Sequence, residues 1–331
     1  MMRALRFLLI ASVLCIGFVP AAIAKLPKIQ DNLNSTVVVI GKKLEGEIKR
    51  PNTPIGMGTG VVFTSSGLFV TNWHVIEKSS AIDVYVYDQD DLNKYKAEIV
   101  GVDKVMDIAI LQIADKLPPV MSHADFGDEP QVGDDIYMIG HPQGMVWTVS
   151  KGIISHLRRY VESPWQRMIQ TDALLMPGNS GGPLFDEMGN IVGINTLIVP
   201  SQDGTNTQAW SMSVHVEDVL WSIGRIMKYG KPRRPALNVD VSYNEDEKAV
   251  FLTPKDNSNL FKAGLTGEAK LIKVADQPIN KFKDLYKFLK TKKDGDSVTI
   301  TVEQNKVAKD YTFELEVWNV LEYDKPKLKT N

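Results

Sequence analysis

The stretch Met176-Pro-Gly-Asn-Ser-Gly-Gly-Pro-Leu184 places one serine among glycines. A nucleophilic serine needs backbone N–H groups that point at the oxyanion it creates, and glycines allow the tight turn that supplies them. Turns of this composition are also common in β-hairpins, so the stretch alone could be a structural hairpin. Ser180 is therefore a candidate nucleophile only if suitable partners lie elsewhere in the chain.

Two candidate partners lie upstream of this serine. His74 belongs to Thr71-Asn-Trp-His-Val75, at the end of a strand that begins after the Ser66-Gly67 turn, and Asp107 directly precedes an apolar strand. Each residue alone would be an ordinary structural histidine or turn aspartate. Together with Ser180 they follow the order His, Asp, Ser, which chymotrypsin-type barrels use and subtilisin and α/β-hydrolase folds do not.

The surrounding sequence consists of short β-branched and aromatic runs between Ser35 and Val219. Clusters of Gly, Pro, Asn and Asp separate the runs, and no long helical pattern lies between them. This spacing is typical of an all-β sandwich or barrel and argues against a parallel α/β sheet. Combined with the order of the three candidate residues, it predicts a mainly β fold, a chymotrypsin-like double antiparallel β-barrel. The clearest runs are 36–40, 60–63, 84–87 and 108–113.

A smaller second domain is predicted after a linker. A helical pattern covers 216–228, and the segment 230–235 is rich in Pro, Gly and charge, which marks an exposed linker. A strand-like run, a helix with apolar residues at three- and four-residue spacing and an alternating strand follow. We therefore expect a small α+β domain at 236–322 and a flexible tail at 323–331. The apolar positions are Val250 to Thr253 in the first strand, Phe282, Leu285, Tyr286 and Leu289 in the helix, and Val298, Ile300 and Val302 in the last strand.

Residues 1–24 have the pattern of a cleaved export signal. Two arginines precede an apolar run at 7–19, and Ala22-Ile23-Ala24 offers small residues for cleavage. A membrane anchor is the alternative, but a spanning helix needs about 20 apolar residues and this run is shorter. The one cysteine, Cys15, lies inside the segment, so the mature chain would contain none. Export without disulfides suits a bacterial periplasm, which is the predicted location.

Charge and histidine content exclude two classes of partner. The 38 basic and 40 acidic residues give a formal net charge of -2, so no overall field draws the chain to nucleic acid. The five histidines show no paired spacing such as H-E-x-x-H, so we expect neither a metal ion nor another cofactor. A chain of 331 residues, 44% of them hydrophobic, is long enough for two globular domains.

Several further motifs give the chain a family resemblance. From about Ser35 to its carboxyl terminus it resembles the HtrA/Deg family of trypsin-like serine proteases. The resemblance implies a trypsin-like serine protease domain at 25–229 and a PDZ-like domain at 236–322. Besides the stretches around His74, Asp107 and Ser180, the motifs that carry it are Gly58-Thr-Gly-Val61, Gly140-His-Pro-Gln-Gly144, Gly152-Ile-Ile-Ser155 and Gln170-Thr-Asp-Ala173.

The resemblance implies a role for each candidate residue. Ser180 would attack the scissile carbonyl, His74 would take its proton and pass it to the leaving amine, and Asp107 would orient the imidazole. The N–H groups of Gly178 and Ser180 would form the oxyanion hole, with Asn179 shaping the loop. The implied activity is that of a serine endopeptidase acting on unfolded or misfolded exported proteins. The alternative is a catalytically silent peptide-binding or chaperone protein with the same fold.

Substrate preference is predicted from the residues just before the serine turn. Leu174 occupies the position of the primary specificity pocket in this fold, and Leu175 and Met176 flank it. No acid is present there to receive Lys or Arg. The apolar lining and the family's preference both predict uncharged aliphatic residues before the cut. The alternative is that these leucines belong to the core.

The second domain resembles a PDZ domain through Ala263-Gly-Leu265 and Gln277-Pro-Ile279. Such domains bind peptide carboxyl termini as an added strand, and the binding loop here would be Leu237, Asn238 and Val239. Asn238 stands where the family usually has glycine, so a degenerate structural domain is the alternative. The resemblance also implies control of the active site through this domain and assembly into a homotrimer.

Overall fold

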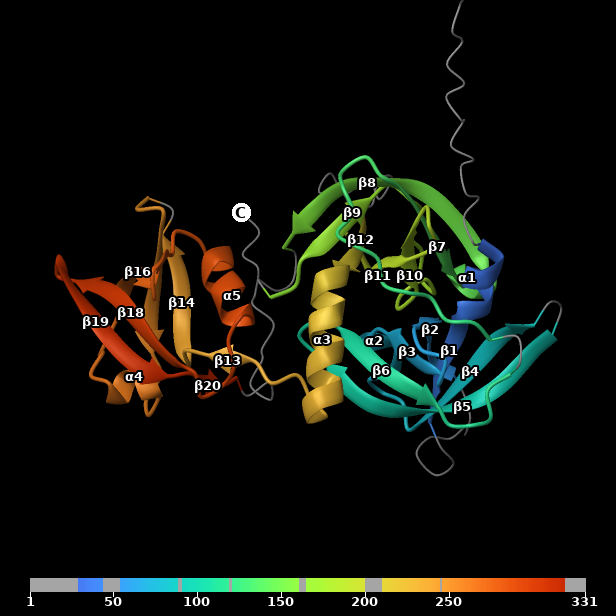
Figure 1. Cartoon of the computed structure of the whole chain (residues 1–331), viewed down its shortest axis with the longest axis horizontal. Helices are drawn as coiled ribbons and strands as arrows, with labels where there is room; N and C mark the ends of the chain where they lie inside the picture. Colours follow the sequence, from blue (N-terminus) through green and yellow to red (C-terminus); the bar gives the residue numbers. More distant parts are fainter. Residues whose placement is uncertain are drawn as a thin grey trace, which may run out of the picture.

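The computed structural model describes residues 29–43, 54–88, 91–118, 121–160, 165–199, 210–244 and 246–318. The predicted signal peptide and the predicted carboxyl-terminal tail lie outside the described residues. The fold is mainly β, with two closed six-stranded barrels and a smaller domain built on a further sheet. This confirms the predicted fold class. Figure 1 shows the barrels on the right and the smaller domain on the left.

The first barrel explains why one strand is apolar at five of its six positions. Its strands are β1 (Thr36–Lys42), β2 (Pro54–Val62), β3 (Leu68–Thr71), β4 (Ala81–Asp88), β5 (Asp91–Asp103) and β6 (Ile108–Ile113). They close in the order β1-β2-β3-β6-β5-β4. In β6, Ala109 and Leu111 pack with the barrel interior, whereas Ile108 and Ile110 belong to a core shared with the second barrel. A strand buried on both faces needs no alternating polar residue.

The second barrel repeats this arrangement. Its strands are β7 (Asp135–Gly140), β8 (Thr148–Arg159), β9 (Met168–Thr171), β10 (Pro183–Asp186), β11 (Ile191–Val199) and β12 (Trp210–His215), closed in the order β10-β11-β12-β9-β8-β7. Ile136, Met138, Ile154 and Leu184 fill its interior. Phe185 faces the shared core instead, as expected for alternation along a strand.

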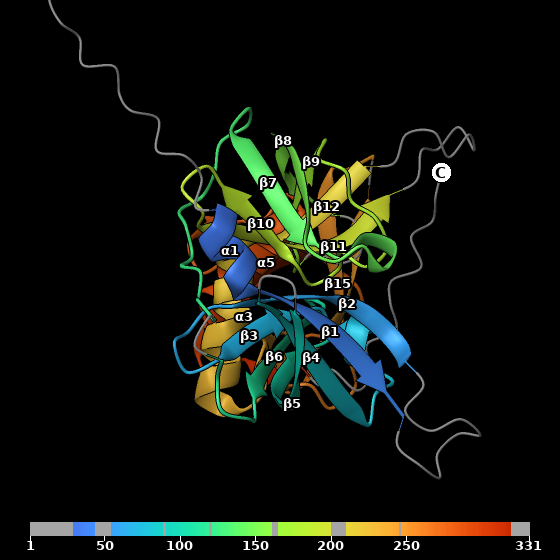
Figure 2. The same cartoon turned by 90° about the vertical axis from the view of Figure 1, so that its right-hand side faces the viewer.

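Four helical segments accompany the described parts of the barrels: α1 (Ile29–Ser35), α2 (Trp73–Ile76), the 3-10 turn η1 (Pro142–Gly144) and α3 (Val216–Tyr229). Figure 2 shows the second barrel above the first, with α1 beside the level where they meet. There Asn32 Nδ2 donates to Tyr137 Oη at 2.6 Å and ties α1 to the second barrel. The helix predicted at 216–228 is α3, and Gly230 ends it with a φ of 71°.

The smaller domain is an α+β unit. A sheet in the order β14-β15-β16-β18-β19 packs against the helix α5, which buries Leu285, Phe288 and Leu289. The apolar residues whose spacing predicted this helix therefore lie on the side that faces the core. The elements are β13 (Pro235–Ala236), β14 (Val239–Asn244), β15 (Ala249–Pro254), α4 (Asn259–Lys262), β16 (Ala269–Val274), β17 (Gln277–Pro278), α5 (Phe282–Lys290), β18 (Ser297–Gln304), β19 (Val307–Glu314) and β20 (Glu316–Val317).

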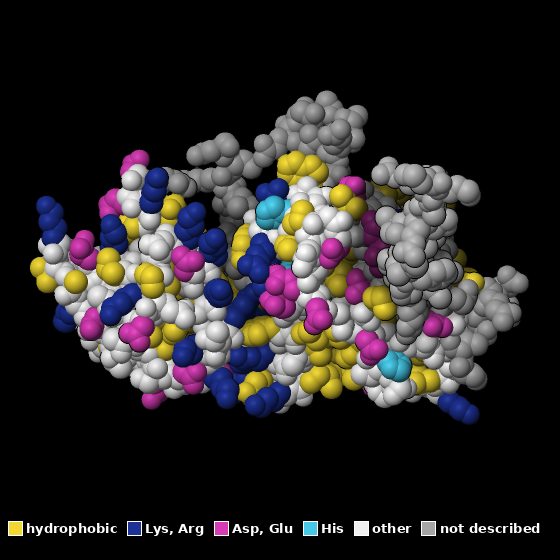
Figure 3. Space-filling view, turned by 45° about the horizontal axis from the view of Figure 1, so that its top comes forward, with side chains coloured by type: hydrophobic (Ala, Val, Ile, Leu, Met, Phe, Trp, Pro, Cys, Tyr) yellow, Lys and Arg dark blue, Asp and Glu magenta, His cyan; other side chains and the backbone are white. Residues whose placement is uncertain are grey.

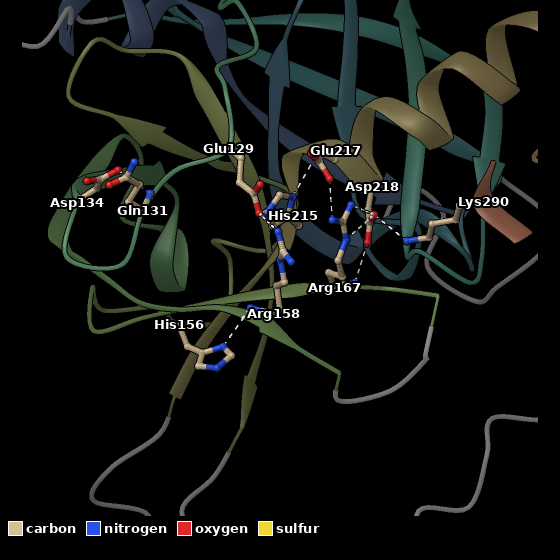
Figure 4. A network of polar contacts seen from close by, with 10 residues as sticks. All are labelled: Glu129, Gln131, Asp134, His156, Arg158, Arg167, His215, Glu217, Asp218 and Lys290. Carbon is tan, nitrogen blue, oxygen red and sulfur yellow. Dashed lines mark hydrogen bonds and ion pairs between the residues drawn. The ribbon is translucent and has the colours of Figure 1, made fainter. Parts of the chain in front are cut away.

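A buried carboxylate joins the smaller domain to the second barrel. Asp218, in the first turn of α3, accepts hydrogen bonds from Arg167 Nη2 at 2.6 Å and from Lys290 Nζ at 2.7 Å. Figure 4 shows both cations converging on it. Burial alone would raise the pKa of Asp218, but Lys290 and Arg167 outweigh burial and hold that pKa below its usual value. Because a buried charge without its partner is costly, this contact holds α5 against α3.

The linker contributes a second buried ion pair, although its composition predicts exposure. Arg234 Nη2 donates to Asp103 Oδ2 at 2.5 Å, and both side chains are 0% exposed. The guanidinium also lies over the rings of Trp165 and Trp221, 5.6 Å and 5.1 Å from their centroids. On the face of the molecule drawn in Figure 3, other Lys and Arg side chains gather where the smaller domain meets the barrels. Arg234 differs from the predicted exposure because its ion-pair partner, Asp103, lies on the first barrel. The sequence of the linker does not reveal a partner that is 131 residues away.

Candidate active site

His74 and Asp107 are in direct contact. His74 lies in the helical turn α2, just after β3, rather than at the end of the strand itself. Its backbone N–H donates to Asp107 Oδ1 at 2.9 Å, and its ring Nδ1 lies 2.6 Å from Asp107 Oδ2. The His74 side chain is 45% exposed. With Nδ1 bonded to the carboxylate, Nε2 is the ring nitrogen that can accept a proton from another group.

Asp107 ends a tight turn in an unusual backbone conformation. Its φ is 53°, a value that few non-glycine residues adopt, although aspartate is among the more tolerant ones. Asp103 Oδ1 caps the turn by accepting from the N–H groups of Val105 and Met106 at 3.2 Å and 3.1 Å. Asp103 is also the partner of Arg234. The turn that presents the carboxylate to the imidazole is therefore bonded to the interdomain linker.

The serine turn is fixed by strands of both barrels. The carbonyl of Ser180 accepts from Thr59 N–H in β2 at 2.8 Å, and Gly181 N–H donates to the carbonyl of Asn195 in β11 at 2.8 Å. Gly178 has a φ of 106°, and a Cβ there would lie 2.2 Å from a backbone oxygen. Glycine is therefore required at position 178 for both conformational and steric reasons.

The predicted oxyanion hole consists of two backbone N–H groups in this turn. Among the described residues, neither Gly178 N–H nor Ser180 N–H donates a hydrogen bond to another group. The carbonyl of Pro177 is held on Gln143 N–H at 2.9 Å, which fixes the orientation of the peptide unit that contains the Gly178 N–H. Asn179 is 5% exposed and packs behind the turn. The arrangement suits stabilisation of negative charge on an oxygen beside Ser180.

A neutral histidine lies beside this turn, since its backbone oxygen is the atom that a Cβ at position 178 would meet at 2.2 Å. His141 is fully buried, and burial lowers its pKa to about 4. Its Nδ1 accepts from Trp147 N–H at 2.9 Å, and the two rings meet edge to face with centroids 5.2 Å apart. His141 therefore stays neutral between pH 5 and 8, the range in which an unperturbed histidine titrates.

Asn72 and Thr196 connect Asp107 to Ser180. Neither residue was among the site residues predicted from the sequence. Asn72 Nδ2 donates to the carbonyl of Asp107 at 2.8 Å and to Thr196 Oγ1 at 3.0 Å. Ser180 Oγ in turn donates to the carbonyl of Thr196 at 3.3 Å. These contacts bring the predicted residues to one place between the barrels. Asn72 lies two residues before His74 in the same motif, which offered a signal, whereas nothing in the sequence around Thr196 did.

The three residues predicted to line a specificity pocket differ in exposure. Leu174 is 64% exposed, and its N–H donates to Ser150 Oγ at 2.9 Å. Leu175 is 5% exposed and belongs to the interior of the second barrel. Met176 is half-buried, and its carbonyl accepts from Asn179 N–H at 3.0 Å. Of the three, Leu174 offers the largest apolar surface beside the serine turn.

The loop predicted to bind peptides lines a cavity of about 370 Å³ between the domains. Leu237, Asn238 and Val239 form one wall, and the side chains of α5 form another. Asn238 has a φ of 54°, which asparagine tolerates better than other residues with a Cβ, so it can replace glycine there. The remaining lining residues are Trp165, Ala236, Val241, Lys255, Leu285, Tyr286, Leu289, Val317 and Trp318.

The described ranges contain neither a cluster of metal-ligating side chains nor a membrane-spanning helix. No group of three or more His, Cys, Asp or Glu side chains in them is placed to hold a metal ion. None of their helices has the length and apolar character that crossing a membrane requires.

Comparison with known proteins gave consistent matches. The model of the trypsin-like peptidase domain family matches residues 58–194. The chain is 32% identical over 286 residues to serine protease Do-like HtrA of Lactobacillus helveticus, covering 78% of this chain and 68% of that protein. It is 31% identical over 262 residues to a probable periplasmic serine endoprotease DegP-like of Bartonella henselae, covering 75% of this chain and 51% of that protein.

Solved structures share the architecture over most of the chain. An HtrA-type protease AlgW with a bound tripeptide superposes with a TM-score of 0.75 at 25% identity, covering 88% of this chain and 96% of that one. The chain spans about half to two thirds of the length of the curated relatives it matches.

Proposed function

Because the chain belongs to the HtrA/Deg family of trypsin-like serine proteases, we propose that it hydrolyses peptide bonds through His74, Asp107 and Ser180. The observation that carries this proposal is the 2.6 Å contact between His74 Nδ1 and Asp107 Oδ2. The N–H groups of Gly178 and Ser180, which donate to no other described residue, add a place for the oxyanion.

In the proposed reaction, Ser180 Oγ bonds to the scissile carbonyl carbon while its proton passes to His74 Nε2. Asp107 stabilises the imidazolium that results, and the N–H groups of Gly178 and Ser180 bind the oxyanion. Each such donor is typically worth about 3 kcal/mol in the transition state. His74 then protonates the leaving amine as the C–N bond breaks, which leaves an acyl ester on Ser180. A water molecule deprotonated by His74 hydrolyses this ester and restores the serine.

The proposed substrates are unfolded or misfolded polypeptides, cut after uncharged aliphatic residues. Leu174 supports this preference, since its side chain is 64% exposed beside the serine turn. Half-buried Met176 extends the same apolar surface, whereas Leu175 contributes from the barrel interior. Unfolding exposes the aliphatic side chains that a folded protein buries, and these could contact the apolar side chains beside the serine turn.

The proposed location is the bacterial periplasm, after removal of residues 1–24. The periplasmic name of the Bartonella henselae relative supports it, together with the pattern of the first residues. The proposed assembly is a homotrimer, which rests on the family resemblance. Light scattering of the purified mature chain tests the assembly, and a monomeric mass would contradict it.

A fluorophosphonate probe distinguishes the proposed peptidase from the alternative, a catalytically silent peptide-binding protein. We expect one adduct per chain, on Ser180, because an activated hydroxyl attacks phosphorus as it would attack a carbonyl carbon. Intact-mass measurement and peptide mapping locate the adduct. Ser213→Ala is the matched control, since its buried hydroxyl is bonded to Asn195 Oδ1 at 2.8 Å and should not affect labelling. A folded chain that forms no adduct, with or without added peptides, would support the silent alternative.

Peptide capture by the PDZ-like domain, with control of the active site, is part of the same proposal. Trp165 comes from the second barrel and Trp318 from the smaller domain, and both line the cavity at Asn238. A peptide with an apolar carboxyl-terminal residue should therefore shift tryptophan fluorescence on binding and change the rate of peptide hydrolysis. The same peptide with an amidated terminus is the control. If the free-acid peptide changes neither signal at millimolar concentration, the domain is the degenerate structural one.

A further inference from the structure

The two peptide units that flank Asp107 are each bonded by a buried side-chain amide. Gln166 Nε2 donates to the carbonyl of Met106 at 2.7 Å, and Asn72 Nδ2 donates to the carbonyl of Asp107 at 2.8 Å. The Gln166 residue is 2% exposed and Asn72 is 0% exposed. Because peptide units are planar, their rotations about the Cα of Asp107 are its φ and ψ. The carbonyl of Asp107 also accepts from Trp73 N–H at 3.1 Å. The Gln166 amide therefore holds the peptide unit that sets φ, and the Asn72 amide together with the Trp73 N–H holds the unit that sets ψ.

Such restraint matters because the backbone of Asp107 is strained. A non-glycine residue at a φ of 53° persists only where its surroundings determine the conformation. Relaxation to an ordinary φ would turn the Cα–Cβ bond and move the carboxylate away from His74. The cap from Asp103 holds the N–H groups of Val105 and Met106, but not the carbonyls on either side of Asp107.

We propose that Gln166 and Asn72 form an amide clamp that keeps Asp107 aimed at the imidazole, which makes Gln166 a positioning residue for the reaction. The two arms come from different barrels, since Asn72 follows β3 and Gln166 precedes β9. Gln166 donates to the turn and not to His74 or Ser180, so it acts through Asp107. The expected effect on kcat rests on the proposed peptidase function, whereas the expected shift of the His74 titration does not.

The decisive variant is Gln166→Met, which keeps the size of the side chain and removes its donor. Gln112→Met is the matched control, because Gln112 Nε2 also donates to backbone carbonyls, those of Ser66 at 2.6 Å and Ile113 at 3.1 Å. Two quantities are measured in the full chain. One is the midpoint of the His74 titration, followed by NMR of labelled imidazole and assigned with His74→Ala; the other is kcat and KM on a peptide substrate.

In Gln166→Met we expect the His74 midpoint to move to lower pH, because a displaced carboxylate stabilises the imidazolium less. We expect kcat to fall by up to about 100-fold with KM unchanged, since misplacing a reacting group by about 1 Å has effects of that size. Gln112→Met should match the wild type in both quantities. A glutamine that merely fills the core would alter the melting temperature but not the His74 titration.

Each outcome bears on the clamp. An unchanged His74 midpoint in folded Gln166→Met would overturn it, whatever the rate. A wild type that hydrolyses no peptide would contradict the proposed function alone, because the NMR titration still tests the clamp. If Gln166→Met does not fold, Gln166→Asn keeps a polar amide but shortens its reach toward the carbonyl of Met106, and an unchanged midpoint in that folded variant would overturn the proposal in the same way.

Discussion

Replacing Ser180 with alanine is expected to lower kcat for peptide hydrolysis by about a million-fold. The reason is that no other group in the turn can form the acyl ester, so hydrolysis would depend on water attacking a carbonyl held in the oxyanion site. The residual rate should resemble that of a binding site without a nucleophile. Initial rates of wild type and Ser180→Ala on the same peptide measure the ratio.

The fold should survive this substitution. Within the described part of the chain, Ser180 Oγ donates one hydrogen bond, at 3.3 Å, to the carbonyl of Thr196, and alanine removes that bond. The backbone bonds to Thr59 at 2.8 Å and from Gly181 to Asn195 at 2.8 Å remain. Equal melting temperatures and equal affinity for a peptide ligand are therefore the control. A folded Ser180→Ala variant whose kcat stays within tenfold of wild type would exclude Ser180 as the nucleophile.

Elements that depend on local pattern were predictable from the sequence. The β-branched runs at 36–40 and 108–113 correspond to β1 and β6, and the amphipathic helix with Leu285 and Leu289 corresponds to α5. In each case the apolar period within a few residues determines which face is buried. The order His, Asp, Ser predicted the barrel type for a different reason, because that order accompanies one fold among those that use such residues.

Features that depend on distant partners were not predictable. Asp218 and Lys290 are 72 residues apart in sequence, and Asp103 and Arg234 are 131 apart, so no local period reveals either pair. The linker was predicted to be exposed because charge usually prefers water, but tertiary contacts bury Arg234 against two tryptophan rings.

The same limit applies to the candidate site. Nothing in the sequence around Gln166 predicts its position at the site, because that position depends on a hydrogen bond to Met106, 60 residues earlier. The positive φ of Asp107 could not be derived either, because aspartate adopts several turn conformations. Glycine at 178 was the exception, since a glycine-rich turn around a candidate nucleophile already indicated a tight turn that glycine allows.

Replacing Asp107 with asparagine is expected to lower kcat by about ten-thousandfold with little change in fold. Asparagine tolerates a positive φ, so the turn that holds residue 107 at a φ of 53° in the wild type should persist. The new amide can donate to His74 Nδ1 and thereby places the imidazole proton on Nε2. His74 then has no lone pair facing Ser180 and cannot act as the base. The ratio of kcat values at pH 8 measures the effect.

Asp115→Asn is the matched control for this variant, because Asp115 Oδ2 also accepts from a backbone N–H, that of Lys96 at 2.7 Å, but contacts no part of the site. It should keep the wild-type kcat. The two aspartate variants separate loss of a particular charge from loss of charge in general, since both change the net charge by the same amount. If Asp107→Asn folds, keeps its melting temperature and loses less than about tenfold in kcat, the tautomer of His74 does not depend on this carboxylate. The proton would then have to be taken by a route that does not pass through the 2.6 Å contact between the two residues.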